Sequence, residues 1–401
     1  MVINTSRYNM GGHTQFSAGK TMKVSRPSLV VQNGKARLAS RIRCGNDLRE
    51  LWYEVPETYA DWFAADRCDG FVVGLLLQAM GRGEDMVVDG PVSSHLWHSL
   101  SHFYIPMLKQ AFPSLHPIKI LPESLTTEPA GGQGVATGFS GGIDSFTAVI
   151  QHLVRETCPD HRVTHFLFHN SGGHGHGGPE DGCRLFWKRF ERVRPFAAEV
   201  GIPMIAVDSN IGRVFPVHYG KVHSALNASV PLVLQQQFRR YYYASGQKYA
   251  DCRVVPGKAI ARLDPLALHL LSTESFTCVS TGCQWSRVEK IRLVSTFEPS
   301  YRYLNVCISA TPNGANCLDC RKCRRTLLTL DLLGCAHLYG KVFDLERYRS
   351  IRARCVCKVL LHHKRPYDAE VIELLTTNGG PLWRAAGAVR AGMKRLAVWR
   401  N

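Results

Sequence analysis

The chain is 401 residues long, 45% of its residues are hydrophobic and 20% are charged, and its formal net charge is +17. This length and composition indicate a globular protein that can bury a large core, divided into two or three units. Its apolar runs are too short to cross a bilayer and no secretory signal is visible, so we expect a cytoplasmic protein without a membrane partner. The excess of positive charge favours anionic partners such as nucleotides or nucleic acid.

Residues 1–130 predict a small α/β region whose role the sequence does not indicate. The first 30 residues are polar and lack a clear period, which is typical of a loose lead-in or an early hairpin. Beyond them, hydrophobic periodicity predicts strands at 51–55, 86–88 and 118–121 and helices at 69–80 and 93–112. A glycine-containing linker at 129–134 then leads into the next region.

The stretch from 135 to 145 reads Val-Ala-Thr-Gly-Phe-Ser-Gly-Gly-Ile-Asp-Ser and predicts a strand, a tight loop and a helix. Gly141 and Gly142 lack a Cβ, so the loop backbone can approach a polyanion closely while unpaired N–H groups at the helix start point towards it. Ser140 and Ser145 can add hydroxyl donors, and Asp144 can hold a metal ion that bridges phosphates. The alternative is an ordinary strand-to-helix connection.

The string Ser-Gly-Gly-Ile-Asp-Ser resembles the pyrophosphate-binding loop of the ATP pyrophosphatase superfamily. It is not a Walker loop, because it lacks Gly-Lys-Ser/Thr. The resemblance implies that the loop grips the β- and γ-phosphates of ATP while the α-phosphate is attacked, which yields an adenylated substrate and pyrophosphate. It implies that Asp144 and Ser145 are catalytic. The residues implied to bind ATP and Mg²⁺ are Ser140, Gly141, Gly142, Ile143, Asp144, Ser145 and Leu167.

Strands and helices alternate from residue 131 to residue 306, which predicts an α/β domain with a parallel, doubly wound sheet. Within it we expect strands at 164–169, 203–210 and 252–256 and helices at 186–200 and 224–243. The glycine- and histidine-rich loop at 170–178 is typical of a surface loop. The alternative is a lid in which His174 or His176 touches an acidic group.

Two helix starts in this domain carry capping signals. Asp264 stands at a capping position before a proline, and Ser286 with Glu289 forms a capping box. Capping alone explains these residues. The second helix start also resembles a Lys-x-Glu element of several ATP pyrophosphatases, with Arg287 in the place of the lysine.

Four cysteines within seventeen residues predict a structural zinc site in an element that spans 307–335. Their spacing, Cys-x9-Cys-x2-Cys-x2-Cys, allows four thiolates to close a tetrahedral shell without an open position, which argues against a catalytic metal. The alternative is a set of buried cysteines that happen to cluster. The predicted ligands are Cys307, Cys317, Cys320 and Cys323.

The loop followed late in the chain by this cysteine pattern resembles the 7-cyano-7-deazaguanine synthase family over roughly residues 134–335. The resemblance implies an adenine nucleotide alpha hydrolase-like fold, and ATP, Mg²⁺ and Zn²⁺ as cofactors. It implies adenylation of a deazaguanine-like carboxylate, attack by a nitrogen nucleophile to give an amide, and dehydration to a nitrile. Residues 1–130 and 336–401 lie outside the match, and such extended ends would suit a relative in a bacterial anti-phage system.

Other functions remain open at this point. One is a tRNA sulfurtransferase that uses the same loop to activate a base, for which Cys183, Cys278 or Cys283 would have to act in sulfur transfer. Another is a non-catalytic zinc and nucleic-acid-binding module. The basic helical region at 336–401 is either a solvated surface or a contact for a nucleic acid or protein, and a homo-oligomer is a further alternative.

Overall fold

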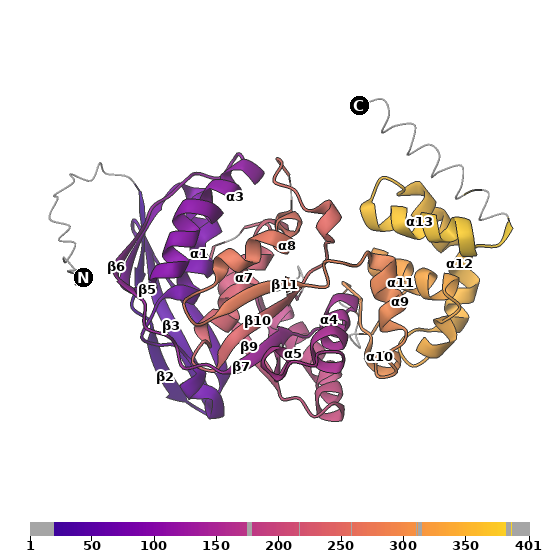
Figure 1. Cartoon of the computed structure of the whole chain (residues 1–401), viewed down its shortest axis with the longest axis horizontal. Helices are drawn as coiled ribbons and strands as arrows, with labels where there is room; N and C mark the ends of the chain where they lie inside the picture. Colours follow the sequence, from indigo (N-terminus) through magenta and orange to yellow (C-terminus); the bar gives the residue numbers. More distant parts are fainter. Residues whose placement is uncertain are drawn as a thin grey trace, which may run out of the picture.

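The computed structural model describes residues 20–174, 179–215, 217–257, 259–309, 311, 315–381 and 386, with the backbone alone at 179–181. N-terminal strands lie at one end of the molecule and a group of C-terminal helices at the other (Figure 1). The strands are β1 (Thr21–Ser25), β2 (Ser28–Gln32), β3 (Lys35–Cys44), β4 (Asp47–Pro56), β5 (Asp85–Ser93), β6 (Ile120–Thr126), β7 (Gly134–Gly138), β8 (His165–His169), β9 (Met204–Ser209), β10 (Phe238–Ala244) and β11 (Thr277–Thr281). The α-helices are α1 (Asp69–Arg82), α2 (Ser94–Ser99), α3 (Ile105–Ala111), α4 (Ile143–Val149), α5 (Pro179–Glu199), α6 (Ile211–Val214), α7 (Tyr219–Val233), α8 (Asp264–Ala267), α9 (Arg287–Val294), α10 (Ser300–Tyr303), α11 (Arg321–Leu332), α12 (Leu345–Leu361) and α13 (Pro366–Asn378).

All strands described join one 11-stranded sheet in the order β11-β10-β7-β8-β9-β4-β3-β1-β5-β6, with β2 paired to β3. The strands from β7 to β11 pair in parallel throughout, whereas β3 pairs antiparallel with β1, β2 and β4. The expected α/β class with a mostly parallel sheet is therefore confirmed. Within the parallel part, β7 stands in the middle, β8 and β9 follow on one side and β10 and β11 on the other. The order in which successive strands are added to the sheet thus reverses beside β7. Ligands of such sheets bind at this switch point.

Both faces of the parallel strands are buried, because alternate side chains enter two different cores. Phe166 and Phe168 of β8 pack in one core with α4 and α5, whereas Leu167 packs in the other core with α1 and α7. Buried apolar runs of this kind are the pattern of a parallel sheet with helices on both faces.

The N-terminal strands continue the same sheet. Strand β4 pairs antiparallel with β9, and the Tyr53 hydroxyl donates to Ser229 Oγ of α7 at 2.8 Å. Helix α1 is almost wholly buried against α7, and Gly70 permits this approach, since a Cβ there would lie 2.9 Å from the Ser229 carbonyl oxygen. Residues 20–126 and the parallel strands therefore share a core, although the chain between them, 127–133, forms neither helix nor strand as expected of a linker.

Two sequence predictions are wrong. The helix expected at 224–243 ends at Val233, and the second half of that segment is strand β10. The sequence of β10, Phe-Arg-Arg-Tyr-Tyr-Tyr-Ala, is rich in residues that favour strands, and pairing with β7 and β11 decides its conformation. No strand forms at 252–256, because β11 rather than this segment occupies the edge of the sheet. The other helices and strands expected between 51 and 210 are found at their expected places, with shifted ends.

The C-terminal helices α11, α12 and α13 pack around a small core of their own that includes Leu328, Val356 and Ile372. A helical character is thus confirmed for 345–378 of the expected C-terminal region, and residues 387–401 lie outside the described part of the chain. No helix in the described residues is both long and apolar enough to cross a membrane.

Candidate functional site

The loop predicted at 139–142 follows β7 at the switch point of the sheet and ends at the start of α4. Gly141 has φ +72°, a conformation that glycine adopts without strain. A Cβ at this position would lie 3.1 Å from the Tyr303 carbonyl oxygen, and the Gly141 carbonyl accepts a hydrogen bond from Asn305 N at 2.7 Å. The glycine is therefore required both for the turn and for close contact with the chain at 303–305.

The other predicted loop residues take different positions. Ser140 is exposed, whereas Ser145 is buried and its hydroxyl donates to the Gly142 carbonyl oxygen at 2.9 Å. Ile143 is buried, and so is Leu167, whose carbonyl accepts from Phe139 N at 2.9 Å inside the sheet. Of these side chains, Ser140 alone is free to meet a ligand, and Ile143 and Leu167 shape the core beneath the loop.

Asp144 lies in the first turn of α4 and binds two cations from α9. Arg287 Nη2 donates to Asp144 Oδ2 at 2.9 Å, and Lys290 Nζ donates to Asp144 Oδ1 at 3.1 Å and to the Ser245 carbonyl oxygen at 2.5 Å. Burial alone would raise the pKa of Asp144, but the charges of Arg287 and Lys290 prevail and lower it to about 2. The carboxylate is thus ionised at neutral pH, the state that can bind Mg²⁺.

Helix α9 presents both cations because its start is held by two sets of caps. Ser286 Oγ accepts from Glu289 N at 3.2 Å while Glu289 Oε2 accepts from Ser286 N at 2.7 Å, so the predicted capping box is confirmed. Residues 287 and 290 are three positions apart and therefore lie on the same face of the helix. Arg287 was flagged in the sequence by its resemblance to a basic element, whereas Lys290 was not predicted.

Helix α13 supplies the second cap of α9, and nothing in the sequence predicted this contact. Glu370 Oε2 accepts from Arg287 N at 2.6 Å and from Val288 N at 3.3 Å. The Tyr367 hydroxyl donates to the Gly246 carbonyl oxygen at 2.7 Å, and its ring centroid lies 5.1 Å from the Arg287 guanidinium. Helix α13 therefore helps to hold Arg287 in place.

A Glu370→Gln variant is expected to lower the free energy of unfolding by about 1 kcal/mol, because loss of a charged cap releases the start of α9. Glu373→Gln, one turn further along α13 and exposed, is the matched control. Urea unfolding of the two variants measures the difference. Equal free energies of unfolding of the two variants would contradict the capping role of Glu370.

Helix α11 contributes further positively charged side chains near Asp144 and Arg287. Lys322, which is exposed, interacts electrostatically with Asp144 and with Arg287. Arg325 lies 4.7 Å from the Tyr367 ring centroid and 3.6 Å from an Asp368 carboxylate oxygen. One carboxylate, Asp144, is thus surrounded by cations from two helices, which leaves a net positive charge beside the glycine loop.

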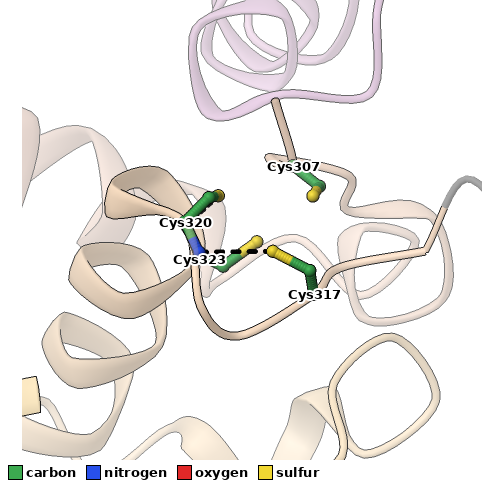
Figure 2. A group of neighbouring side chains, drawn as sticks. All are labelled: Cys307, Cys317, Cys320 and Cys323. Atoms are coloured by element: carbon green, nitrogen blue, oxygen red, sulfur yellow. Dashed lines mark hydrogen bonds between the residues drawn. The ribbon is translucent and has the colours of Figure 1, made fainter. Parts of the chain in front are cut away.

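The four cysteines meet as predicted (Figure 2), and their sulfurs lie within 4.8 Å of one another. A tetrahedral zinc site with bonds of about 2.3 Å places its sulfurs about 3.8 Å apart, so the cluster fits this metal. Cys317 Sγ accepts from Cys320 N and Cys320 Sγ accepts from Cys323 N, at 3.3 and 3.4 Å. These contacts wrap the turn around the sulfurs at the start of α11, and Cys307 approaches from a separate segment.

The cysteine cluster is joined to the glycine loop at two points. Asn305, which binds Gly141, lies two residues before Cys307, and Lys322 lies between two of the cysteines on α11. Asn316 fixes the segment further, since its side chain donates to the Leu304 and Val342 carbonyl oxygens at 2.9 and 3.0 Å. A metal bound by the cysteines would therefore hold both the chain at 303–305, which packs against the loop, and Lys322 of α11.

The histidine lid, which is the alternative to a surface loop at 170–178, receives no support from the described part of this loop. His174 packs against Phe168 and Phe186, and its Nε2 lies 2.7 Å from the His169 carbonyl oxygen. Burial lowers the pKa of His174 to about 4. His176 lies outside the described residues.

Comparisons of the chain with protein-family models, with curated proteins and with solved structures found no match. The function is therefore inferred from the chemistry of the site itself.

Proposed function

We propose that this protein is an ATP-dependent adenylating enzyme of the ATP pyrophosphatase type, which converts ATP to AMP and pyrophosphate. The single observation that carries the proposal is the cation group of Arg287, Lys290 and Lys322 around Asp144, beside a glycine loop at the switch point of the sheet. Polyphosphate needs such a group of donors, and the exposed Ser140 of the loop can add a hydroxyl donor to it.

The charges support a nucleotide triphosphate rather than a neutral ligand. Lys290 is 1% exposed and Arg287 is 10% exposed at its side chain, so both cations are desolvated and act strongly on a phosphate. Asp144 would hold Mg²⁺, which supplies further neutralisation of the phosphates when bound. The protein contributes mainly positioning and charge neutralisation around the α-phosphate.

In the proposed reaction a carboxylate oxygen of the acceptor attacks the α-phosphorus. The bond to the bridging oxygen breaks, and pyrophosphate leaves with the electron pair into the field of Arg287 and Lys290. A nitrogen nucleophile then attacks the acyl carbon and AMP departs. The resemblance in the two motifs favours a carboxylate of the deazaguanine type as the acceptor, and an adenine nucleotide alpha hydrolase-like fold for the parallel part of the sheet.

Thiol positions favour this reaction over sulfur transfer. Cys278 and Cys283 are 0% and 1% exposed, and burial raises the pKa of each thiol. Cys183 is partly buried, and burial and Asp208 raise its pKa as well. A persulfide carrier needs an accessible thiolate, and these three thiols do not provide one.

The test is the nucleotide product formed from ATP and Mg²⁺ with 7-carboxy-7-deazaguanine and ammonia. AMP and pyrophosphate that appear with the acceptor and are absent in an Asp144→Ala variant are expected. Formation of ADP and phosphate, or of AMP at the same rate in Asp144→Ala, would exclude the proposed chemistry.

A further inference from the structure

A chain of hydrogen-bonded side chains leads from His223 on α7 to the buried carboxyl group of Asp264 at the start of α8. The ring of His223 is partly exposed, and its Nδ1 lies 3.0 Å from Ser224 Oγ and 3.1 Å from the Tyr243 hydroxyl. Ser224 Oγ in turn donates to Asp264 Oδ1 at 2.5 Å. Asp264 is 2% exposed and its Oδ2 has no hydrogen-bond partner among the described residues. A buried carboxyl group is thus connected to an accessible imidazole.

The outer end of this chain lies near the candidate nucleotide site. Tyr243 stands two residues before Ser245, whose carbonyl oxygen binds the same Lys290 that holds Asp144. Lys322 acts electrostatically both on His223 and on Asp144. The partly exposed His223 is thus linked through Tyr243 and Lys322 to the charged group around Asp144.

Asp264, at the buried end of this chain of side chains, can accept a proton near neutral pH. Burial raises the pKa of Asp264 to about 7, although the Ser224 hydrogen bond favours the ionised form. The titratable groups that face it from other elements are Tyr104, Tyr243, Cys252, Cys278 and Cys283, and burial raises the pKa of each of them. All are uncharged at neutral pH, so no cation among the described residues stabilises the carboxylate, and protonation near pH 7 relieves the cost of its burial.

The imidazole of His223 does not retain a second proton at neutral pH. Burial, and after it the charge of Lys322, lowers the pKa of the imidazole to about 4. Its neighbours on α7 and β10, Tyr219 and Tyr243, are neutral as well. The ring is thus uncharged, and no partner of Nε2 is found among the described residues.

We propose that His223, Ser224 and Asp264 form a proton relay for the nitrogen nucleophile, with His223 Nε2 as the group that touches it. The proposal rests on the proposed function. As the nitrogen–carbon bond forms, the N–H proton passes to Nε2, the Nδ1 proton passes to Ser224 Oγ, and the serine proton passes to Asp264 Oδ1. The bond from the acyl carbon to the AMP oxygen breaks and AMP leaves with the electron pair. His223 ends neutral and Asp264 ends protonated, which are the states that their surroundings favour.

The first test needs no acceptor. Histidine labelled with ¹⁵N in the full chain, with the His223 signal assigned from a His223→Gln variant, reports the protonation of both ring nitrogens. We expect a neutral ring with the proton on Nδ1 from pH 6 to 8, and a change in the Nδ1 signal near pH 7 that disappears in Asp264→Asn. An imidazolium at pH 7, or an unchanged titration in Asp264→Asn, would overturn the relay. Asp264→Asn is expected to fold, because it removes a buried ionisable group.

The second test separates the two steps of the reaction with the deazaguanine carboxylate and ammonia. Asp264→Asn and Ser224→Ala are expected to slow ammonia-dependent product formation about 100-fold and to abolish its rise with pH through 7. Exchange of pyrophosphate into ATP, which precedes the nucleophile, should change less than about twofold. Ser229→Ala, which removes a buried hydroxyl from the same helix outside the chain of proton donors, is the control.

The outcomes are distinguishable from those of the proposed function. Equal losses in exchange and product formation, or the same loss in Ser229→Ala, would reduce the network to a structural role. If the wild type shows no pyrophosphate exchange with this acceptor, the proposed function fails for it, and the nitrogen signals of His223 still decide whether the relay exists.

Discussion

An Asp144→Asn variant is expected to lose ATP turnover by about 10³-fold and yet to bind pyrophosphate, without Mg²⁺, at least as tightly as the wild type. The carboxylate is the proposed metal ligand, so its loss removes catalysis. Among the described residues it is also the one carboxylate that forms ion pairs with Arg287 and Lys290, so its loss leaves two desolvated cations free for an anion. Turnover and anion affinity should therefore move in opposite directions.

The same variant should also be less stable. Lys290 is 1% exposed and would lose its counter-ion, whereas Asp144 itself is 28% exposed at its side chain. Breaking a fully buried pair costs about 3–5 kcal/mol, and the partial exposure of Asp144 reduces this to about 1–3 kcal/mol. Pyrophosphate should restore the lost stability, since its charge replaces that of the carboxylate.

Thermal melting with and without pyrophosphate in EDTA measures both effects. We expect a lower melting temperature for Asp144→Asn than for the wild type, and a larger upward shift on adding pyrophosphate. Asp160→Asn is the control, because Asp160 forms an exposed ion pair with Arg239 and is 77% exposed. A smaller pyrophosphate shift in Asp144→Asn than in the wild type would argue against phosphate binding by the two cations.

Local patterns predicted those parts of the site that lie within one element. The glycine loop, the capping box of α9 and the cysteine spacing each span a few residues, and each forms as expected. Strand β10 shows the limit of such patterns. No glycine or proline between Leu234 and Phe238 marks the end of the neighbouring helix α7, and pairing with β7 and β11 decides that the chain becomes a strand.

Contacts between distant segments could not be predicted. Arg287 and Lys290 meet Asp144 across 143 and 146 positions, and Tyr367 meets Gly246 across 121. Asp264 was interpreted as a helix cap, which explained its position in the sequence, whereas the structure buries its side chain against Ser224 on another helix. A residue that satisfies a local rule gives no signal of a second role, so the relay is visible only in the folded chain.

A Cys323→Ser variant is expected to lose bound zinc and, with it, the order of the segment that supports the glycine loop. Structural zinc contributes about 10 kcal/mol of binding free energy to the fold around it. Cys323 is buried at the first turn of α11, so its loss should loosen Lys322 and Arg325 on that helix and also Asn305, which binds the Gly141 carbonyl oxygen. ATP affinity should fall by more than about tenfold as a consequence.

Cys355→Ser provides the matched control, because Cys355 is 1% exposed on α12 and lies outside the cluster. Both variants bury a hydroxyl in place of a thiol. A difference between them in exchange protection is therefore due to the loss of the metal. Zinc content per chain, and hydrogen exchange over 304–332, measure the result. The wild type should hold one zinc and Cys355→Ser should retain it, while Cys323→Ser should lose zinc together with exchange protection. A wild type purified with zinc present that contains none, or full zinc in Cys323→Ser, would leave the four cysteines as buried thiols and remove the metal from the support of the nucleotide site.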